Sequence, residues 1–245
     1  MAKAFILCAG RGERLWPLST VLPKCLWPIG GKPCVRHIVE RLPLLSVDGA
    51  EHYEVYICCL EKDLPLYKHE FRDLVYGVKF LSTSEPLGTA GQLVPAQKDY
   101  PPIPLDEPFL IHYGDCLVDV DFTDLLKVHR ESRASATLVL SNRVRSEFGQ
   151  VKLMDAGGYK EVQVVQFQEK PFLQGWTWTG IAVLNPDVVQ YLGVSLDFGK
   201  DVFPQLLSKG ALIYPYKVEK SYYDIGTIRA YTDVNVLAEG GRLFE

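Results

Sequence analysis

Short, continuously apolar runs alternate with amphipathic segments along most of the chain. Runs of this length predict buried strands, whereas apolar residues repeated at helical spacing predict helices packed on a sheet. The expected strands are residues 3–8, 54–59, 78–81, 109–113 and 136–141, and the expected helices are 34–44, 123–133 and 227–237. This alternation indicates an α/β fold with a mixed, mainly parallel sheet.

The pattern changes after about Phe148 to shorter strands. Strands are expected at residues 150–154, 163–168 and 178–184, and Pro186 is expected to open a short helix. The Pro-rich stretch 100–108 reads as a surface loop, and no repeat or low-complexity linker separates the two parts. We therefore expect one domain spanning residues 1–245, in which the second half supplies the pocket for a second substrate.

The amino-acid composition argues against some classes of binding partner. The chain has 245 residues, 47% of them hydrophobic, and a formal net charge of −4, which opposes general binding to nucleic acid or to a membrane surface. No apolar run reaches transmembrane length, and residues 4–9 are too short for a signal-peptide core. The expectation is a soluble, cytoplasmic, globular protein without nucleic-acid or membrane partners.

The six cysteines include no Cys-x-x-Cys pair and none follows Cys116. This spacing supports neither a zinc ribbon nor a distributed disulfide framework. Cys8 ends an apolar strand, so a packing role is favoured over a catalytic thiol.

The first apolar strand leads into a loop that carries Gly10, Gly12, Arg14 and, further on, Lys24. Glycines let the backbone approach a polyphosphate, and fixed cations neutralise its charge. The loop lacks the Gly-Lys-Ser/Thr ending of a Walker motif, and Leu15 stands where a dinucleotide fingerprint has its third glycine. A phosphate-handling loop of another type is therefore predicted.

Four further segments carry polar groups at the ends of predicted elements. They are 85–91 (Glu-Pro-Leu-Gly-Thr-Ala-Gly), Gly114-Asp115, 168–171 (Gln-Glu-Lys-Pro) and 222–227 (Tyr-Tyr-Asp-Ile-Gly-Thr). Carboxyl ends of strands face the ligand crevice in open α/β sheets, which places Asp115 where it could hold a hard cation. Each segment also has a structural interpretation: a helix cap at Thr89 or Asp224, a turn at Asp115, and a surface ion pair at Glu169-Lys170.

Together these motifs resemble the sugar-1-phosphate nucleotidylyltransferase family over nearly the entire chain. The opening signature falls on residues 10–19 and 23–26, and the other four segments follow in the family's order. The chain departs from the family pattern at Tyr113, Tyr222 and Ile228. The resemblance implies a Rossmann-like, three-layer α/β/α fold.

The implied reaction is in-line attack of a sugar-1-phosphate oxygen on the α-phosphorus of a nucleoside triphosphate, which releases pyrophosphate. The resemblance gives catalytic roles to Arg14, Lys24, Asp115 and Asp224, with Mg²⁺ held by Asp115 and Asp224. Such a reaction depends on positioning and charge stabilisation rather than on a covalent intermediate.

The resemblance also implies two binding regions. Residues 1–147 would form the nucleotide-binding half and residues 148–245 the sugar-phosphate-binding half. The residues expected to bind the nucleotide are Leu7, Ala9, Gly10, Gly12, Arg14, Thr83, Gly88 and Thr89, and those expected to bind the sugar phosphate are Gly149, Glu169, Lys170 and Gly180.

The form of residues 85–91 is most similar to that of mannose-1-phosphate guanylyltransferases, so GTP and mannose-1-phosphate are the first expectation. UTP or dTTP with glucose-1-phosphate, or another sugar-1-phosphate, remains open. A regulatory paralogue that binds a nucleotide sugar without catalysis is a rival, and a nicotinamide-dependent dehydrogenase is a weaker one. Trp176 and Trp178 could mark a contact in a homo-oligomer, the sugar pocket or the core.

Overall fold

A computed structural model describes residues 2–43, 52–74, 78–98, 102–146, 148–155 and 162–244. The strands are β1 (Ala2–Leu7), β2 (Pro28–Ile29), β3 (Lys32–Pro33), β4 (Tyr53–Leu60), β5 (Val78–Thr83), β6 (Phe109–Tyr113), β7 (Cys116–Val118), β8 (Ala136–Arg143), β9 (Gln150–Asp155), β10 (Val162–Gln168), β11 (Thr177–Leu184) and β12 (Ile213–Asp224). The α-helices are α1 (Leu18–Val21), α2 (Cys34–Arg41), α3 (Leu64–Glu70), α4 (Val94–Lys98), α5 (Phe122–Ser132), α6 (Phe203–Ser208) and α7 (Ile228–Glu239). Short 3₁₀ turns occupy Glu13–Leu15, Lys24–Leu26, Glu61–Asp63, Gly91–Leu93 and Pro186–Tyr191, and a π-helical turn covers Phe198–Val202.

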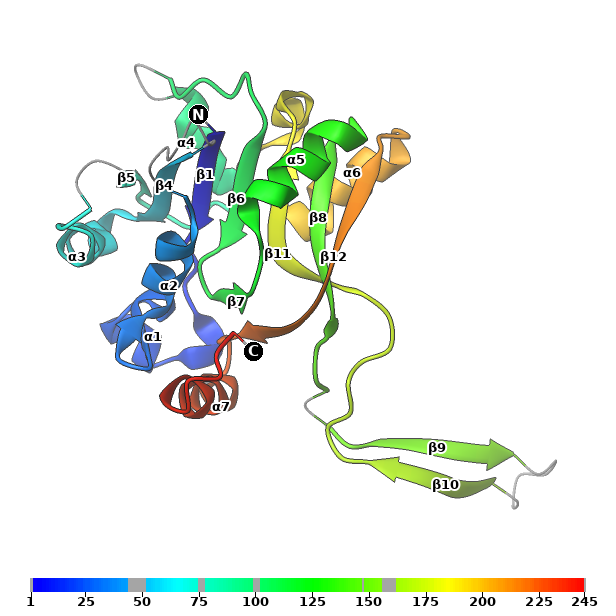
Figure 1. The fold of residues 1–245 in the computed structure, drawn as a ribbon. Coiled ribbons are helices and arrows are strands. Elements are labelled where there is room, and N and C mark those ends of the chain that lie inside the picture. The colour runs from blue at the N-terminus through cyan, green and yellow to red at the C-terminus, as the bar shows by residue number, and fades with distance from the viewer. Residues whose placement is uncertain are drawn as a thin grey trace.

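Eight strands form one sheet in the order β5-β4-β1-β6-β11-β8-β12-β7 (Figure 1). Strands β5, β4, β1 and β6 are mutually parallel, and β8 and β12 run in the same direction because β11 lies antiparallel to both β6 and β8. The prediction of a mixed, mainly parallel sheet is confirmed. All eight predicted strands are present, as are the three predicted helices, apart from Leu44, which lies outside the described residues.

Two strands of the sheet, β12 and β7, were not predicted from the pattern of apolar residues. Strand β12 carries exposed and buried residues without clear alternation, and β7 has only three residues. The expectation of a loop at 100–108 holds for residues 102–108, where no helix or strand is found, while Tyr100 and Pro101 lie outside the described residues.

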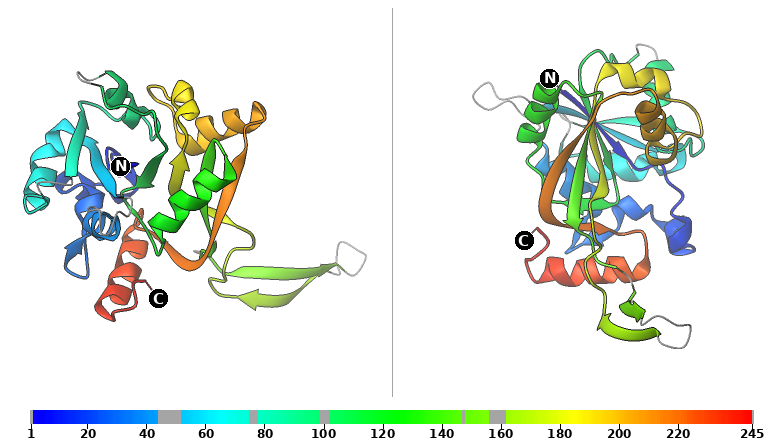
Figure 2. Two further views of the ribbon diagram at one scale, coloured as in Figure 1. Left: turned by 45° about the horizontal axis from the view of Figure 1, so that its top comes forward. Right: turned by 90° about the vertical axis from the view of Figure 1, so that its right-hand side faces the viewer.

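Two hydrophobic cores cover the two faces of the sheet. In β1, Ala4 and Ile6 face a core that includes α2 and α5, whereas Phe5 and Leu7 face a second core that includes Leu93 and Leu206. Alternate residues of a strand point to opposite faces, so one strand contributes to both cores. Helices therefore cover both faces, and the predicted three-layer α/β/α architecture is confirmed (Figure 2).

The hairpin of β9 and β10 projects away from this body (Figure 1). Its apolar residues Val151 and Leu153 are more than half exposed. Gly149 lies where a Cβ would come within 2.8 Å of the Phe167 ring and 2.9 Å of the Glu169 carboxylate. The hairpin therefore begins and ends with two residues that were predicted to bind the sugar.

Among the described residues, no helix is both long enough and apolar enough to cross a bilayer. All six cysteines are buried and free. Burial raises the pKa of Cys8 well above its ordinary value, so this thiol stays protonated and serves packing, as predicted.

Trp27 fixes the opening segment against the C-terminal helix. Its ring is buried, its indole N–H donates to the Leu22 carbonyl at 2.9 Å, and it packs edge-on against Tyr231 of α7 with the ring centres 4.9 Å apart. Tyr231 in turn donates to the Pro28 carbonyl at 2.9 Å. An unusual neighbour of Lys24 in the sequence is thus the anchor of α7.

Trp27→Phe is expected to lower the free energy of unfolding by about 1–2 kcal/mol, because it removes the buried indole hydrogen bond and part of the packed volume. Urea denaturation would measure the change. Trp16→Phe is the matched control, since Trp16 is 72% exposed and its loss should cost under about 0.5 kcal/mol. Equal effects at the two positions would contradict this role of Trp27.

Candidate active site

The loop after β1 surrounds a cavity of about 500 Å³. Gly12 has a positive φ of 64°, and a Cβ there would lie 3.0 Å from Ser19, so a glycine is required for the turn. The cavity is lined by Arg11, Gly12, Glu13, Arg14, Lys24, Pro86 and Gly226. Three of the residues predicted from the phosphate-loop pattern, Gly12, Arg14 and Lys24, therefore face one space.

Lys24 forms an ion pair with Asp115, which follows β6. Both side chains are largely buried; burial alone would lower the pKa of Lys24, but the Asp115 carboxylate raises it above its ordinary value, so Lys24 remains a cation. Gly114 is needed here because a Cβ would lie 2.4 Å from the Cys8 sulfur and 3.0 Å from that of Cys25. Close packing on two small thiols thus sets the position of Asp115.

Asp224 ends β12 and lies beside Asp115. Antiparallel pairing of β12 with β7 puts Asp224 opposite Cys116, and the Ile225 N–H donates to the Asp115 carbonyl at 3.1 Å. Residues that are 109 positions apart in sequence thereby share one site (224 − 115 = 109). Asp224 does not cap α7, because Thr227 accepts from the Ala230 N–H at 3.2 Å instead.

Burial, followed by the charge of Asp115, raises the pKa of Asp224 above its ordinary value, although the Arg14 and Lys24 cations act in the opposite direction. Arg14 approaches one carboxylate oxygen of Asp224, with Nη2 3.7 Å from Oδ2. The other oxygen, Oδ1, is buried and has no hydrogen-bond partner. Two neighbouring carboxylates, one of them with a buried oxygen that has no hydrogen-bond partner, thus lie between the cations of Lys24 and Arg14.

The residues present fit a hard divalent cation at this position. No group of three or more His, Cys, Asp or Glu side chains suited to a metal occurs in the described part of the chain, so a closed protein cage is not available. Mg²⁺ commonly uses one or two carboxylates and completes its coordination with water and substrate phosphates. Asp115 and Asp224 match that arrangement.

The raised pKa of Asp224 gives a testable pH dependence. A carboxyl titrates near about 3.9 in the unfolded chain, and a higher pKa in the fold means that the native state binds the proton more tightly. The stabilisation from this proton is present at acid pH and is lost as pH rises through the raised pKa. In metal-free buffer, the Tm of Asp224→Asn should therefore exceed that of the wild type at neutral pH, and the difference should shrink toward pH 4; a difference independent of pH would contradict this.

Gly226 places Arg14 against Asp224. A Cβ at Gly226 would lie 2.3 Å from Arg14 Nη2 and 2.8 Å from Asp224 Oδ1. Any side chain at this position would occupy the space of the guanidinium. Gly226 was not singled out from the sequence, although it lies in the Asp-Ile-Gly-Thr segment that was.

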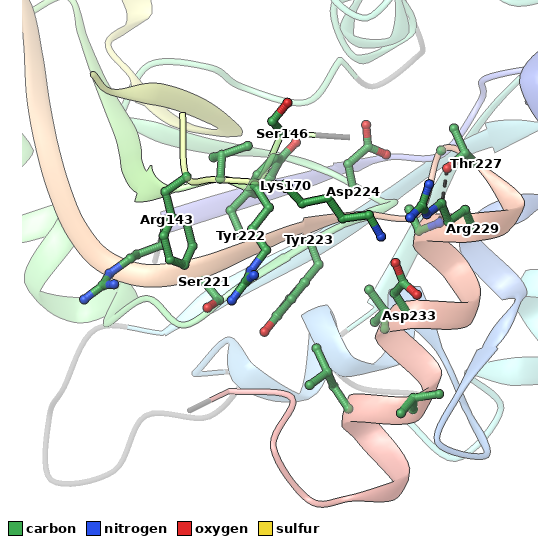
Figure 3. A pocket seen from close by; sticks show the side chains of 18 of the residues that line it. Arg143, Ser146, Lys170, Ser221, Tyr222, Tyr223, Asp224, Thr227, Arg229 and Asp233 are labelled. Carbon is green, nitrogen blue, oxygen red and sulfur yellow. Dashed lines mark hydrogen bonds between the residues drawn. The ribbon is translucent and has the colours of Figure 1, made fainter. Parts of the chain in front are cut away.

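A second cavity, of about 740 Å³, has Arg14 and Gly226 in its lining (Figure 3 shows residues of this cavity). Its lining includes Asp224, Lys170, Tyr222 and Tyr223, and Lys170 has a positive φ of 47°. Arg14 and Gly226 line both cavities. The two pockets thus meet at Arg14, one of the residues that the sequence predicts to be catalytic, and at Gly226.

The sequence model of the family described as Nucleotidyl transferase matches residues 3–240, nearly the whole chain. The chain belongs to the nucleotidyl transferase family.

Curated relatives of this chain carry two kinds of name. The UTP–glucose-1-phosphate uridylyltransferase of Synechocystis sp. is 32% identical over 94% of the chain and 61% of the relative. The mannose-1-phosphate guanyltransferase of Yarrowia lipolytica is 34% identical over 91% of the chain and 60% of the relative. The chain therefore spans about three fifths of the length of these relatives.

Solved nucleotidyl transferase structures share the fold. A putative glucose-1-phosphate thymidylyltransferase from Bacillus anthracis, in complex with sucrose, aligns with a TM-score of 0.68 at 20% identity, over 98% of the chain and 96% of that structure. HddC from Yersinia pseudotuberculosis, complexed with GMP-PN, aligns with a TM-score of 0.68 at 19% identity, over 96% and 99%. At this identity the likeness establishes the fold.

Several residues predicted to bind the nucleotide lie outside the two cavities. Leu7 and Ala9 are buried, and the Ala9 N–H donates to the Gln92 side-chain carbonyl at 3.1 Å. Gly10 is exposed in the loop, and the Thr83 hydroxyl donates to the Glu85 carbonyl at 2.8 Å. Contact of these four residues with a nucleotide stays a prediction. Gln92, which links the opening loop to residues 85–91, was missed because a buried glutamine has no sequence signature.

Gly88 and Thr89 are held against the segment that precedes α6. A Cβ at Gly88 would lie 2.4 Å from the Leu196 carbonyl oxygen. The Thr89 hydroxyl donates to Asp197 at 2.9 Å and accepts from the Phe198 N–H at 2.9 Å, so Thr89 does not act as a simple helix cap. Tyr113 also donates to the Thr89 hydroxyl at 3.1 Å. Nucleotide contacts from these residues remain predictions.

On the sugar side, only Lys170 of the four predicted residues lines the larger cavity. Gly180, with a positive φ of 80°, lies under Tyr113, where a Cβ would be 2.9 Å from the ring. Trp178 is partly buried and packs against the core, edge-on to Tyr113 and Phe203, with ring centres 5.2 Å and 4.9 Å apart. Sugar binding by Gly149, Glu169 and Gly180 stays a prediction, whereas Arg143, Arg145 and Arg229 are cavity residues that the sequence reading missed.

Proposed function

We propose that this chain transfers a nucleotidyl group from a nucleoside triphosphate to a sugar-1-phosphate. The observation that carries the proposal is the meeting of two cavities at Arg14 and Gly226, directly beside the paired carboxylates of Asp115 and Asp224. A two-substrate reaction requires two adjoining pockets with the reacting atoms between them. The family membership and the relatives named for this chemistry support the same conclusion.

In the proposed reaction, the triphosphate lies in the smaller cavity and the acceptor phosphate lies near Lys170. An acceptor phosphate oxygen attacks the α-phosphorus, a new P–O bond forms, and the bond to pyrophosphate breaks. Arg14 stabilises the negative charge on the leaving pyrophosphate, and Lys24 stabilises charge at the α-phosphate. Mg²⁺, when held by Asp115 and Asp224, would reduce the repulsion between the two anionic substrates.

GTP and mannose-1-phosphate are our first choice of substrates. Their support is the form of residues 85–91 and the mannose-1-phosphate guanyltransferases among the relatives, such as that of Yarrowia lipolytica. The Synechocystis relative supports UTP with glucose-1-phosphate as the alternative. A regulatory paralogue that binds without catalysis is disfavoured, because Arg14, Lys24, Asp115 and Asp224 are all present and adjacent.

Pyrophosphate release tests the proposal. The purified chain with Mg²⁺ would be assayed with GTP, UTP, dTTP, CTP and ATP against mannose-, glucose-, N-acetylglucosamine- and heptose-1-phosphates. Release with one preferred pair establishes the activity, and the GTP and mannose-1-phosphate pair is expected to be the most active. Tight binding of a nucleotide sugar without release from any pair would overturn catalysis and favour the regulatory role.

A further inference from the structure

The larger cavity carries more positive charge than one phosphate group requires. Six cationic side chains line it, whereas its acidic lining residues are two. The cations are Arg14, Arg143, Arg145, Lys170, Arg229 and Arg242, and the acids are Asp224 and Asp233. Of these cations, only Arg14 has an acidic partner among the described residues. Four net positive charges in one cavity favour a ligand that is itself strongly anionic.

Figure 3 shows how the charged groups are distributed. Asp224, Thr227 and Arg229 lie toward one end, the amino group of Lys170 lies between, and Arg143 lies toward the opposite end. A phosphate that reacts beside Asp224 can use Lys170 and Arg14. Arg143, at the far end, is therefore placed to bind a different group of the ligand.

Arg143 and Arg145 gather around one aromatic ring. Their guanidinium carbons lie 5.3 Å and 4.8 Å from the centre of the Phe172 ring. An aromatic face holds a guanidinium in place without neutralising its charge. Two arginines held against one ring repel each other, and an anion that binds both would relieve that repulsion.

The backbone fixes this arginine pair in position. Arg145 forms an antiparallel bridge with Phe172, the Ser146 N–H donates to the Pro171 carbonyl at 2.8 Å, and the Leu173 N–H donates to the Val144 carbonyl at 2.8 Å. Residues 143–146 and 171–173 are thus joined next to Lys170. A pre-formed site loses less conformational entropy on binding than a flexible one.

We infer that the acceptor of this enzyme is a sugar-1-phosphate that carries a second anionic group, a carboxylate or a phosphate, bound by Arg143 and Arg145. The inference rests on the proposed function, because it assigns the reacting phosphate to the Asp224 end of the same cavity. A cavity of about 740 Å³ is large enough to hold such a sugar along its length. Arginine is suited to both groups, since its planar guanidinium binds carboxylate and phosphate in bidentate fashion.

The test compares kcat/KM for three acceptors of one stereochemistry: a hexose 1-phosphate, the corresponding hexuronic acid 1-phosphate and the hexose 1,6-bisphosphate. The wild type should prefer at least one doubly anionic acceptor by about tenfold or more, and the preferred one identifies the second group as carboxylate or phosphate. Arg143→Gln and Arg145→Gln should each reduce this preference ratio about tenfold. Equal use of all three acceptors, or an unchanged ratio in both variants, would overturn the inference.

Arg72→Gln is the matched control, because Arg72 is exposed and, among the described residues, its guanidinium forms hydrogen bonds with His69. Thermal melting of each variant checks that folding is retained. Calorimetric titration of the doubly anionic acceptor, with Mg²⁺ present, separates this inference from the proposed function. If both variants bind this acceptor about tenfold more weakly but the wild type shows no turnover, the anion site is supported and catalysis is overturned. If both variants bind it as tightly as the wild type, the anion site is overturned.

Discussion

Asp115→Asn is expected to lower kcat about a thousandfold, with the fold retained. The substitution removes one of the two carboxylates that fit Mg²⁺, and it leaves Lys24 largely buried without its acidic partner. Each loss removes stabilisation of charge that develops during phosphoryl transfer, where such groups contribute most to the rate. Pyrophosphate release, measured at saturating substrates over a range of Mg²⁺ concentrations, would quantify the effect.

Asp106→Asn provides the control, since Asp106 is exposed in the loop before β6. It should leave kcat within about twofold of the wild type, as surface substitutions far from a site have small effects. If Asp115→Asn retained kcat within tenfold and kept its dependence on Mg²⁺, the assignment of Asp115 as a metal ligand would be wrong.

Gly226→Ala is expected to lower kcat/KM about a hundredfold without unfolding the protein. The added methyl group would lie 2.3 Å from Arg14 Nη2, so the guanidinium must leave its position beside Asp224. Arg14 is the flexible end of a long side chain, and 63% of that side chain is exposed, so its displacement costs little folding energy. The loss falls instead on stabilisation of the leaving pyrophosphate, where removing one well-placed donor costs about a hundredfold or more.

A double-mutant cycle with Arg14→Ala isolates this mechanism. If Gly226→Ala acts by displacing Arg14, it should add less than about threefold to the loss that Arg14→Ala already causes. Fully multiplicative losses in the double variant would show that Gly226→Ala acts through another group, such as Asp224 Oδ1, which lies 2.8 Å from the added carbon. Gly199→Ala serves as a packing control, because its added carbon would make only an ordinary 3.5 Å contact with Trp178.

Much of the fold follows from local sequence patterns. The apolar runs correctly predicted β1, β4, β5, β6 and β8 because buried strands leave a continuous local signature. The long β12 was not predicted because five of its twelve residues are exposed, only one is buried, and its pattern does not alternate. Strand β7 has only three residues, which are too few to show a periodic pattern.

The residues of the candidate site also divide into those with a local sequence signal and those without one. Arg14, Lys24, Asp115 and Asp224 were recognisable because glycine-rich turns and charged residues at the ends of apolar segments have a chemical meaning that can be read locally. Gly226 was not, since its significance lies in the guanidinium that occupies the space of its missing side chain. Cys25 and Trp27 likewise have no local signal, because their roles depend on packing beside Gly114 and against Tyr231.

The sequence by itself determined the α/β class and most strands, and it predicted a phosphate-binding role for the opening loop. Only the tertiary structure decided that β12 pairs with β7, which brings Asp224 beside Asp115, and that Arg14 lines two cavities, one of them also lined by Arg143 and Arg145. The physical reason is the separation along the sequence over which each signal acts. Hydrophobic periodicity and turn chemistry act between neighbours in the chain. The meeting of distant residues depends instead on strand order and register, which are set by the packing of the whole sheet.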